Sequence, residues 1–389
     1  MARRIDAIVK PELLRWARDS AGLDLEEAAE RLGMKPETVA AWESARARLS
    51  VAQLQKLATT YRRPLAAFYL PAPPPVFDAR KYLRRVAGAA ERPPSPDLAF
   101  EIREAESRRR IALDLADPDA ERQSMVPRAD LGEAPAAVAA SLRSVLGVTV
   151  EEQLRWRDDY DALNAWRASV ERLGVLVFQV SGVEPAEMRG YSIFQEELPI
   201  VGVNAKDSPR ARSFSLLHEV AHLVLGHGDV DRSARFWLSN DQEETFCNEV
   251  AGNVLVPENA LAPLTTLQRG DRGKAVSPSD VAFLMARFRV SEEVILLRLL
   301  RTGRIADSFY EQRRRVLVHL RPKKAEGGPP YYRRVVAMLG RPYVRTVLDA
   351  FSRDRITLND VSDYLGVKLD QLSRVEAAVR VPYSEEAAG

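Results

Sequence analysis

The feature that most constrains this chain is a cluster of three of its four histidines, at His218, His222 and His227. The first two belong to the segment HEVAH, which has the pattern HExxH. On a helix, residues four apart share a face with Cβ atoms about 5–6 Å apart, so both imidazoles can reach one metal ion. A helix is indicated from Pro209 to Leu225, because a serine-proline pair opens it and a glycine follows it. We therefore predict that His218 and His222 are metal ligands.

A third ligand is expected, because a catalytic zinc site usually keeps three protein ligands and one open position. The longer pattern HExxHxxGxxH needs a glycine at position 225 and a histidine at 228, where the sequence has Leu225 and Gly228. The next predicted helix, residues 241–256, offers carboxylates instead. The candidates are Glu243, Glu244 and Glu249. We favour Glu244, because the apolar residues of this helix place it at the buried edge. These apolar residues are Cys247, Val250, Ala251 and Val254.

The residue types of this cluster suit peptide-bond hydrolysis. Zinc lowers the pKa of a bound water to about 7 and polarises a carbonyl group. Glu219 lies beside the two histidines and can pass the proton of that water to the leaving amine. A strand near Tyr191 to Gln195 offers an edge for an extended substrate. The alternative is a buried helix whose two histidines only form hydrogen bonds.

Three neighbouring residues have simpler interpretations. His227 is expected to interact with the carbonyl groups at a helix end. Cys247, the single cysteine, is expected to be a small core residue, and it excludes an internal disulfide. Asn248 either bonds to the ligand helix or only packs against it.

The amino-terminal segment predicts a helix-turn-helix. A first helix from Leu25, a turn at Gly33 and a second helix opening at Lys35 and Pro36 fit this motif. In such a motif the start of the second helix enters the major groove, and basic residues contact phosphates. The candidate nucleic-acid-binding residues are Glu37, Thr38, Ala41, Ser44, Arg46 and Arg48. Residues 1–70 hold 12 basic and 9 acidic residues, so a protein-docking role is the alternative.

Patterning along the chain predicts a mainly α fold with one small sheet. Period-2 or continuous apolar segments indicate three strands, at Val175–Val180, Gly190–Gln195 and Ile200–Asn204. Between Pro135 and Leu173 we expect two helices. The expected domains are a helix-turn-helix bundle (1–70), a Pro-rich linker (71–97), an α+β metallopeptidase-like domain (98–304, metal core 174–265), a linker (305–330) and a carboxyl-terminal helical domain (331–389).

Two further segments repeat the helix-turn-helix pattern. Residues 358–372 share a leucine, a Leu-Gly pair and a lysine in register with residues 25–39, and residues 280–295 are a looser copy. For these two copies we expect helix pairs that serve packing alone.

Charge and hydropathy exclude several classes of protein. Lys and Arg number 57 against 55 Asp and Glu, so nonspecific coating of nucleic acid is not expected. No segment has the length or apolarity of a signal peptide or membrane span. We therefore expect a cytoplasmic protein without a membrane partner.

The quoted segments resemble two known families. PELLRWARDSAGLDLEEAAERLGMKPETVAAWES resembles the xenobiotic-response-element type of helix-turn-helix regulator. SFSLLHEVAHLVLGHG followed by EETFCNEVAGNVLVP resembles the ImmA/IrrE metallo-endopeptidases. The second resemblance implies a gluzincin-like domain with Glu244 as third ligand, and zinc, or alternatively manganese, as the ion.

The resemblance also implies a function in stress or mobile-element gene control. Its substrate would be a DNA-bound, repressor-type helix-turn-helix protein, and double-stranded DNA and a second copy of the chain are further partners that the sequence allows. The alternative is a DNA-binding transcription regulator whose peptidase-like domain senses a signal with little turnover. A third interpretation is an interaction protein of a toxin-antitoxin or phage system that docks onto a related repressor.

Overall fold

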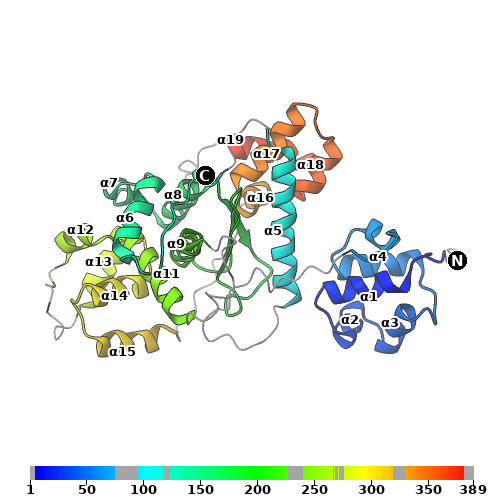
Figure 1. Cartoon of the computed structure of the whole chain (residues 1–389), viewed down its shortest axis with the longest axis horizontal. Helices are drawn as coiled ribbons and strands as arrows, with labels where there is room; N and C mark the ends of the chain where they lie inside the picture. The colour runs from blue at the N-terminus through cyan, green and yellow to red at the C-terminus, as the bar shows by residue number, and fades with distance from the viewer. Residues whose placement is uncertain are drawn as a thin grey trace. The chain divides into compact units, whose positions relative to one another are not determined.

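The computed structural model describes residues 5–74, 95–117, 123–226, 240–265, 267, 270, 276–318 and 330–380 (Figure 1). The chain forms two compact units, residues 1–84 with 90–106 and residues 85–89 with 107–389. The described part of the first unit is built from helices, and the second unit adds one three-stranded sheet. The prediction of a mainly α chain with a small sheet is confirmed.

The first unit has its own apolar core, in which Leu13, Leu54 and Phe68 are fully buried. Its helices are α1 (Pro11–Ser20), α2 (Leu25–Leu32), α3 (Pro36–Glu43), α4 (Val51–Thr60) and the 3₁₀ turn η1 (Leu65–Tyr69). Asp24 caps α2, and Gly33 ends it with a φ of 62°, a left-handed conformation that glycine adopts without strain. The predicted turn between α2 and α3 is therefore confirmed. Helix α5 (Pro96–Leu115) belongs to this unit through residue 106.

The sheet of the second unit has the order β1-β3-β2. Its strands are β1 (Leu176–Val180), β2 (Gly190–Ile193) and β3 (Ile200–Asn204). Strand β1 runs parallel to β3 with Leu176 opposite Ile200, and β2 runs antiparallel to β3 with Gly190 opposite Val203. All three predicted strands are present, and β2 lies at an edge of the sheet.

The helices before the sheet differ from prediction. Two helices were expected between Pro135 and Leu173, but the structure has α6 (Pro135–Leu146), α7 (Val150–Gln153) and α8 (Asp159–Arg172). The Asp158 carboxylate accepts hydrogen bonds from the backbone amides of Tyr160 and Asp161, and this cap begins a new helix.

Helix α9 (Pro209–Leu225) packs against α8, α11 (Asn240–Leu255), β2 and β3. Figure 1 shows α9 between α11 and the sheet. The helices that follow are α12 (Glu258–Leu261), η3 (Ala262–Leu264), α13 (Pro278–Phe288), α14 (Glu292–Arg301) and α15 (Asp307–Val318). The linker predicted at 305–330 is wrong for residues 307–318. Phe309 and Tyr310 of α15 pack against the main core, and Arg313 pairs with Glu292 of α14, which explains why this segment is helical.

The carboxyl-terminal helices belong to the second unit and do not form a separate domain. They are α16 (Tyr331–Leu339), α17 (Arg341–Ser352), α18 (Leu358–Leu365), η4 (Leu369–Gln371) and α19 (Leu372–Arg380). Helix α16 packs on β1, whose five residues are all buried and therefore need a cover. The buried Arg167 of α8 donates to the carbonyls of Val177 in β1 and Ala337 in α16, which ties the three elements together.

The three predicted helix pairs share one turn. The first helix of each pair ends at Gly33, Arg289 or Gly366, with φ of 62°, 56° and 61°. An extended N-cap residue two positions later opens the next helical segment. Among the described residues, no helix is both long and apolar enough to cross a bilayer.

Candidate functional site

Helices α9 and α11 bring a histidine pair and a carboxylate together. His218 and His222 lie one turn apart on α9, and Glu244 projects from the first half of α11. Both helices are held in place by apolar contacts, since Leu217, Val220 and the Cys247 side chain are fully buried in one core. The cluster is therefore fixed by packing on both sides.

The three side chains converge on a single point. The Nε2 atoms of His218 and His222 lie 3.1 Å apart. The Glu244 oxygens lie 3.3 Å from His218 Nε2 and 3.4 Å from His222 Nε2. All of the ligand atoms offered by these residues fall within 4.8 Å of one another. Sequence reasoning grouped these three residues, and the fold brings them together.

These distances fit a small tetrahedral cation. Ligands at 2.0–2.1 Å from a tetrahedral ion lie about 3.3–3.4 Å from one another. The two Nε2 atoms lie 3.1 Å apart, and each lies 3.3–3.4 Å from a different oxygen of Glu244, so these spacings are close to that value. Two imidazole nitrogens and one carboxylate oxygen are also the donor types that zinc prefers in catalytic sites. The residues present therefore fit a zinc-like ion.

Charge in the cluster is arranged around the carboxylate. Burial by itself would raise the pKa of Glu244, but the hydrogen bonds from His218 and His222 lower it well below its usual range. Burial lowers the pKa of His218, but Glu244, Glu219 and Asn248 outweigh it, so this pKa lies above its ordinary value. Glu244 thus stays ionised at neutral pH and favours a cation beside it. Asn248, for which sequence reasoning left two roles open, lies close enough to His218 to contribute to that raised pKa.

Glu219 lies on α9 between the two histidines and faces β2. The residue is 8% exposed, and a Cβ atom built on Gly190 would come within 2.8 Å of its Oε1. Gly190 therefore leaves the space that the Glu219 carboxyl group occupies at the start of the edge strand. Sequence reasoning did not single out this glycine. An isolated glycine in a strand pattern, which often marks a close approach, was the available signal.

The three candidate carboxylates of α11 have different partners. Besides Glu244, Glu243 places its Oε1 3.1 Å from Nδ1 of His222. Glu249 pairs with Arg301 at 3.1 Å and lies away from the cluster. The Cys247 sulfur is 3.4 Å from the same Nδ1, and the cysteine is buried as expected. His227, expected at a helix end, lies outside the described residues.

The predicted nucleic-acid-binding residues spread over α3 and the loop after it. Glu37 is exposed near the start of α3, and Thr38 and Ala41 are half-buried. The other three residues, Ser44, Arg46 and Arg48, are exposed beyond the end of the helix. Ser44 does not project from the first turns of α3. It is the C-cap residue, and its hydroxyl donates to the carbonyl of Ala40 and accepts from Arg46.

A buried ion pair that sequence reasoning missed fixes α3 against α1. Glu43 is 6% exposed and accepts two hydrogen bonds from Arg18, at 2.7 and 3.0 Å. This bidentate pair raises the pKa of Arg18, chiefly through the hydrogen bond. Glu43 is thereby turned away from any nucleic acid, which leaves Glu37 as the exposed acid of α3.

Comparison with known proteins bears on both units. Residues 170–300 match the family model described as the IrrE N-terminal-like domain of M78 peptidases, and this range contains α9 and α11. Residues 14–68 match a helix-turn-helix family model. No curated protein matches the chain. The resemblance inferred from the sequence is thus confirmed: the chain carries an N-terminal segment that matches a helix-turn-helix model and a later segment that matches a metallopeptidase-like model.

Proposed function

We propose that this chain is a zinc-dependent endopeptidase that cleaves a repressor-type regulatory protein. The observation that carries the proposal is the convergence of two imidazoles and one carboxylate at 3.1–3.4 Å, next to a second carboxylate that is not part of the triad. A hydrogen-bonded histidine pair alone would not need Glu219 buried beside it. The match to a peptidase family over residues 170–300 supports the same conclusion.

In this proposal His218, His222 and Glu244 hold the ion. A zinc ion bound there supplies a Lewis acid that polarises the scissile carbonyl and acidifies a water molecule. Glu219 accepts the proton of that water and delivers it to the leaving amine, which requires its carboxylate to be held in a fixed position. The missing side chain at Gly190 leaves the room for that position. Glu243 orients the His222 ring through Nδ1, as a carboxylate commonly does for a ligand histidine.

The free edge of strand β2 is the proposed binding site for the substrate. In the described part of the chain β2 pairs with β3 on one side only. Its first residue is Gly190, which packs against the Glu219 carboxyl group. An extended peptide that adds to this edge would place its backbone beside Glu219. The substrate class is therefore an exposed or flexible segment of a regulatory protein, which can adopt an extended conformation.

The helix-turn-helix domain is proposed to bring the peptidase to its target. It would do so by binding DNA through α3 and the loop holding Arg46 and Arg48, or by docking onto a related repressor. With both parts on one chain, the peptidase would be held close to a DNA-bound repressor. A sensor with little turnover is the second candidate, because the same triad that fits a catalytic ion also fits a regulatory one.

The decisive test is cleavage of a helix-turn-helix repressor, with the candidate taken from the genes adjacent to this one. Purified full-length protein is incubated with that repressor after dialysis against a chelator, and again after addition of zinc or manganese. We expect cleavage only with metal, and a loss of about 10²–10⁴-fold in rate for Glu219→Gln at unchanged metal content. Cleavage by Glu219→Gln at the parent rate would remove Glu219 as the base. Stoichiometric metal with no cleavage by the parent protein would favour the sensor.

A further inference from the structure

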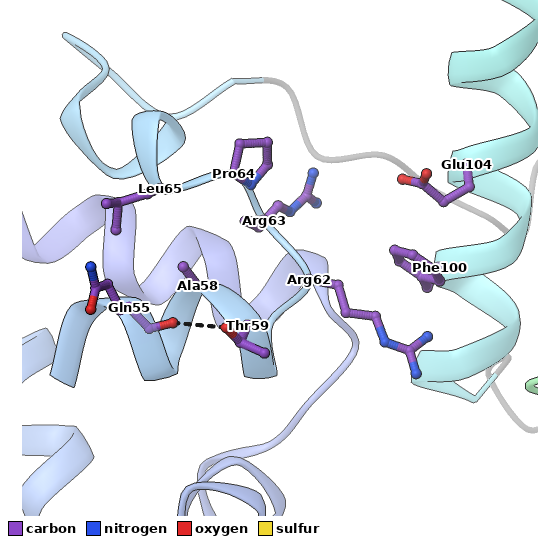
Figure 2. Close-up of a pocket in the computed structure, with 9 residues that line it drawn as sticks. All are labelled: Gln55, Ala58, Thr59, Arg62, Arg63, Pro64, Leu65, Phe100 and Glu104. Carbon is purple, nitrogen blue, oxygen red and sulfur yellow. Dashed lines mark hydrogen bonds between the residues drawn. The ribbon is translucent and has the colours of Figure 1, made fainter. Parts of the chain in front are cut away.

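A pocket of about 490 Å³ lies in the first unit, away from the predicted nucleic-acid-binding residues of α3. One wall comes from the end of α4 and the segment leading to η1, and the other comes from α5 (Figure 2). Figure 2 shows Arg63 and Glu104 facing each other across this pocket, with Phe100 beside Glu104. The pocket thus has a cationic wall and an acidic wall.

Arg63 is the unusual residue of the pocket. Its guanidinium group stacks over the Trp16 ring at 4.7 Å, and its Nε is buried without a hydrogen-bond partner. Within the part of the chain that the structure describes, the Arg63 side chain makes no hydrogen bond or ion pair. Burial and the neighbouring Arg103 lower the pKa of Arg63 to about 10. A half-buried guanidinium group with one unsatisfied nitrogen and no direct ion pair gains from an anion placed beside it.

The other two arginines nearby are already engaged. Arg62 pairs with Asp97 at 2.7 Å and lies 4.4 Å from the Phe100 ring centre. Arg103 donates to the carbonyls of Ser20 and Arg62. Each of these two guanidinium groups therefore has a fixed role in holding α5 against the bundle. Arg63 does not share that role, which leaves it available to a ligand.

The acidic wall limits the charge that the pocket can accept. Glu104 is close enough to raise the pKa of Arg63. An anion placed between them gains from Arg63 but is repelled by Glu104, and the repulsion grows with each added negative charge. A single negative charge is thus favoured over a phosphate dianion. The remaining lining includes Ala58, Pro64 and Leu65, which suit a short apolar group.

We propose that this pocket binds a small organic monocarboxylate, whose carboxylate pairs with Arg63 and whose apolar part packs on Ala58 and Leu65. A planar carboxylate matches the two parallel N–H bonds of a guanidinium group. The occupant would contact α4, the segment before η1 and α5 together. It is therefore a ligand site of the helix-turn-helix unit, and it does not depend on the proposed peptide cleavage.

The test uses benzoate as the probe and the full chain as the protein. Benzoate is titrated at fixed ionic strength and followed by ligand-observed NMR. We expect saturable binding to the parent protein, weakened at least tenfold by Arg63→Gln. Arg31→Gln, which removes an exposed arginine of α2 outside the pocket, is the matched control and should bind benzoate as the parent does.

A second variant keeps the proposal falsifiable if Arg63→Gln fails to fold. Glu104→Gln removes the repelling charge and leaves Arg63, so benzoate should bind severalfold more tightly. Absence of saturable binding to the parent would overturn the proposal, as would equal binding by Arg63→Gln or an equally weakened affinity in Arg31→Gln. Tighter binding of inorganic phosphate than of benzoate by the parent protein would also overturn it, because the pocket would then accept a dianion.

Discussion

Two helix pairs of this protein, α9 with α11 and α2 with α3, differ in how they present polar groups. In the first pair the polar atoms point inward and meet within 4.8 Å. In the second pair the buried acid, Glu43, accepts two hydrogen bonds from Arg18 of α1. The residues of this pair that could bind DNA or a protein lie on an exposed surface.

This difference determines how specific each chemical inference is. A buried cluster with matched distances admits few occupants, because each polar atom must be satisfied by its neighbours or by an ion. An exposed surface imposes no such condition, so α3 fits DNA or a protein equally well by geometry. The peptidase-like site can therefore be tested residue by residue, while the helix-turn-helix needs a binding partner.

The largest effect is expected from breaking the inward cluster at Glu244. Glu244→Ala removes one of three donors and should weaken zinc affinity by more than about 100-fold. Glu243→Gln removes only the carboxylate beside Nδ1 of His222 and should weaken it by about 10-fold.

Competition with a chromophoric chelator measures both affinities. Glu249→Gln is the matched control, since that glutamate pairs with Arg301 and should leave the affinity unchanged. Equal affinities for all three variants would show that α11 does not supply the third ligand.

A smaller effect is expected from crowding the same cluster. In Gly190→Ala the new Cβ would meet the Glu219 carboxyl group at 2.8 Å and displace it. We expect repressor cleavage to slow by about 10–100-fold while metal content stays the same, because the base is misplaced and the ligands are not. Gly132→Ala, where a Cβ would meet nothing within 4 Å, is the control for cleavage assays. Loss of metal in Gly190→Ala would mean that the strand supports the ligands and not Glu219.

The smallest effects are expected for variants of the exposed residues that follow α3, measured as changes in DNA affinity. If α3 binds DNA, replacing Arg46 and Arg48 together by glutamine should weaken binding several-fold. The slope of log K against log salt concentration should also become shallower, by about one for each phosphate that the protein no longer neutralises. Gel shifts at two or more salt concentrations measure this. Lys368→Gln, at the N-cap of η4 in the second unit, should have no effect. An affinity that the double variant does not change would favour protein docking.

Sequence patterning succeeded where one local rule decided the outcome. The HExxH spacing, the three strands and the turn at Gly33 depend on helical periodicity, strand alternation and glycine conformation, and the structure has each of them. Patterning was less successful where contacts with a distant segment determine whether a stretch is helical or to which unit it belongs. Helix α15 occupies a stretch that looked like a linker, because its stabilising partners, such as Glu292, lie on another helix. The carboxyl-terminal helices were assigned a domain of their own, but the buried strand β1 needs α16 as its cover.

The sequence alone therefore determined the three strands, the helix-turn-helix and the residues able to bind a metal, since each depends on spacing within one segment. Only the tertiary structure decided that Glu244 meets the two Nε2 atoms while Glu243 meets Nδ1 of His222. It also decided that Gly190 makes room for Glu219 and that Glu43 is withdrawn from the surface. These outcomes depend on how separate helices and strands pack against one another. Packing couples residues far apart in the chain, and no periodicity within one segment encodes that coupling.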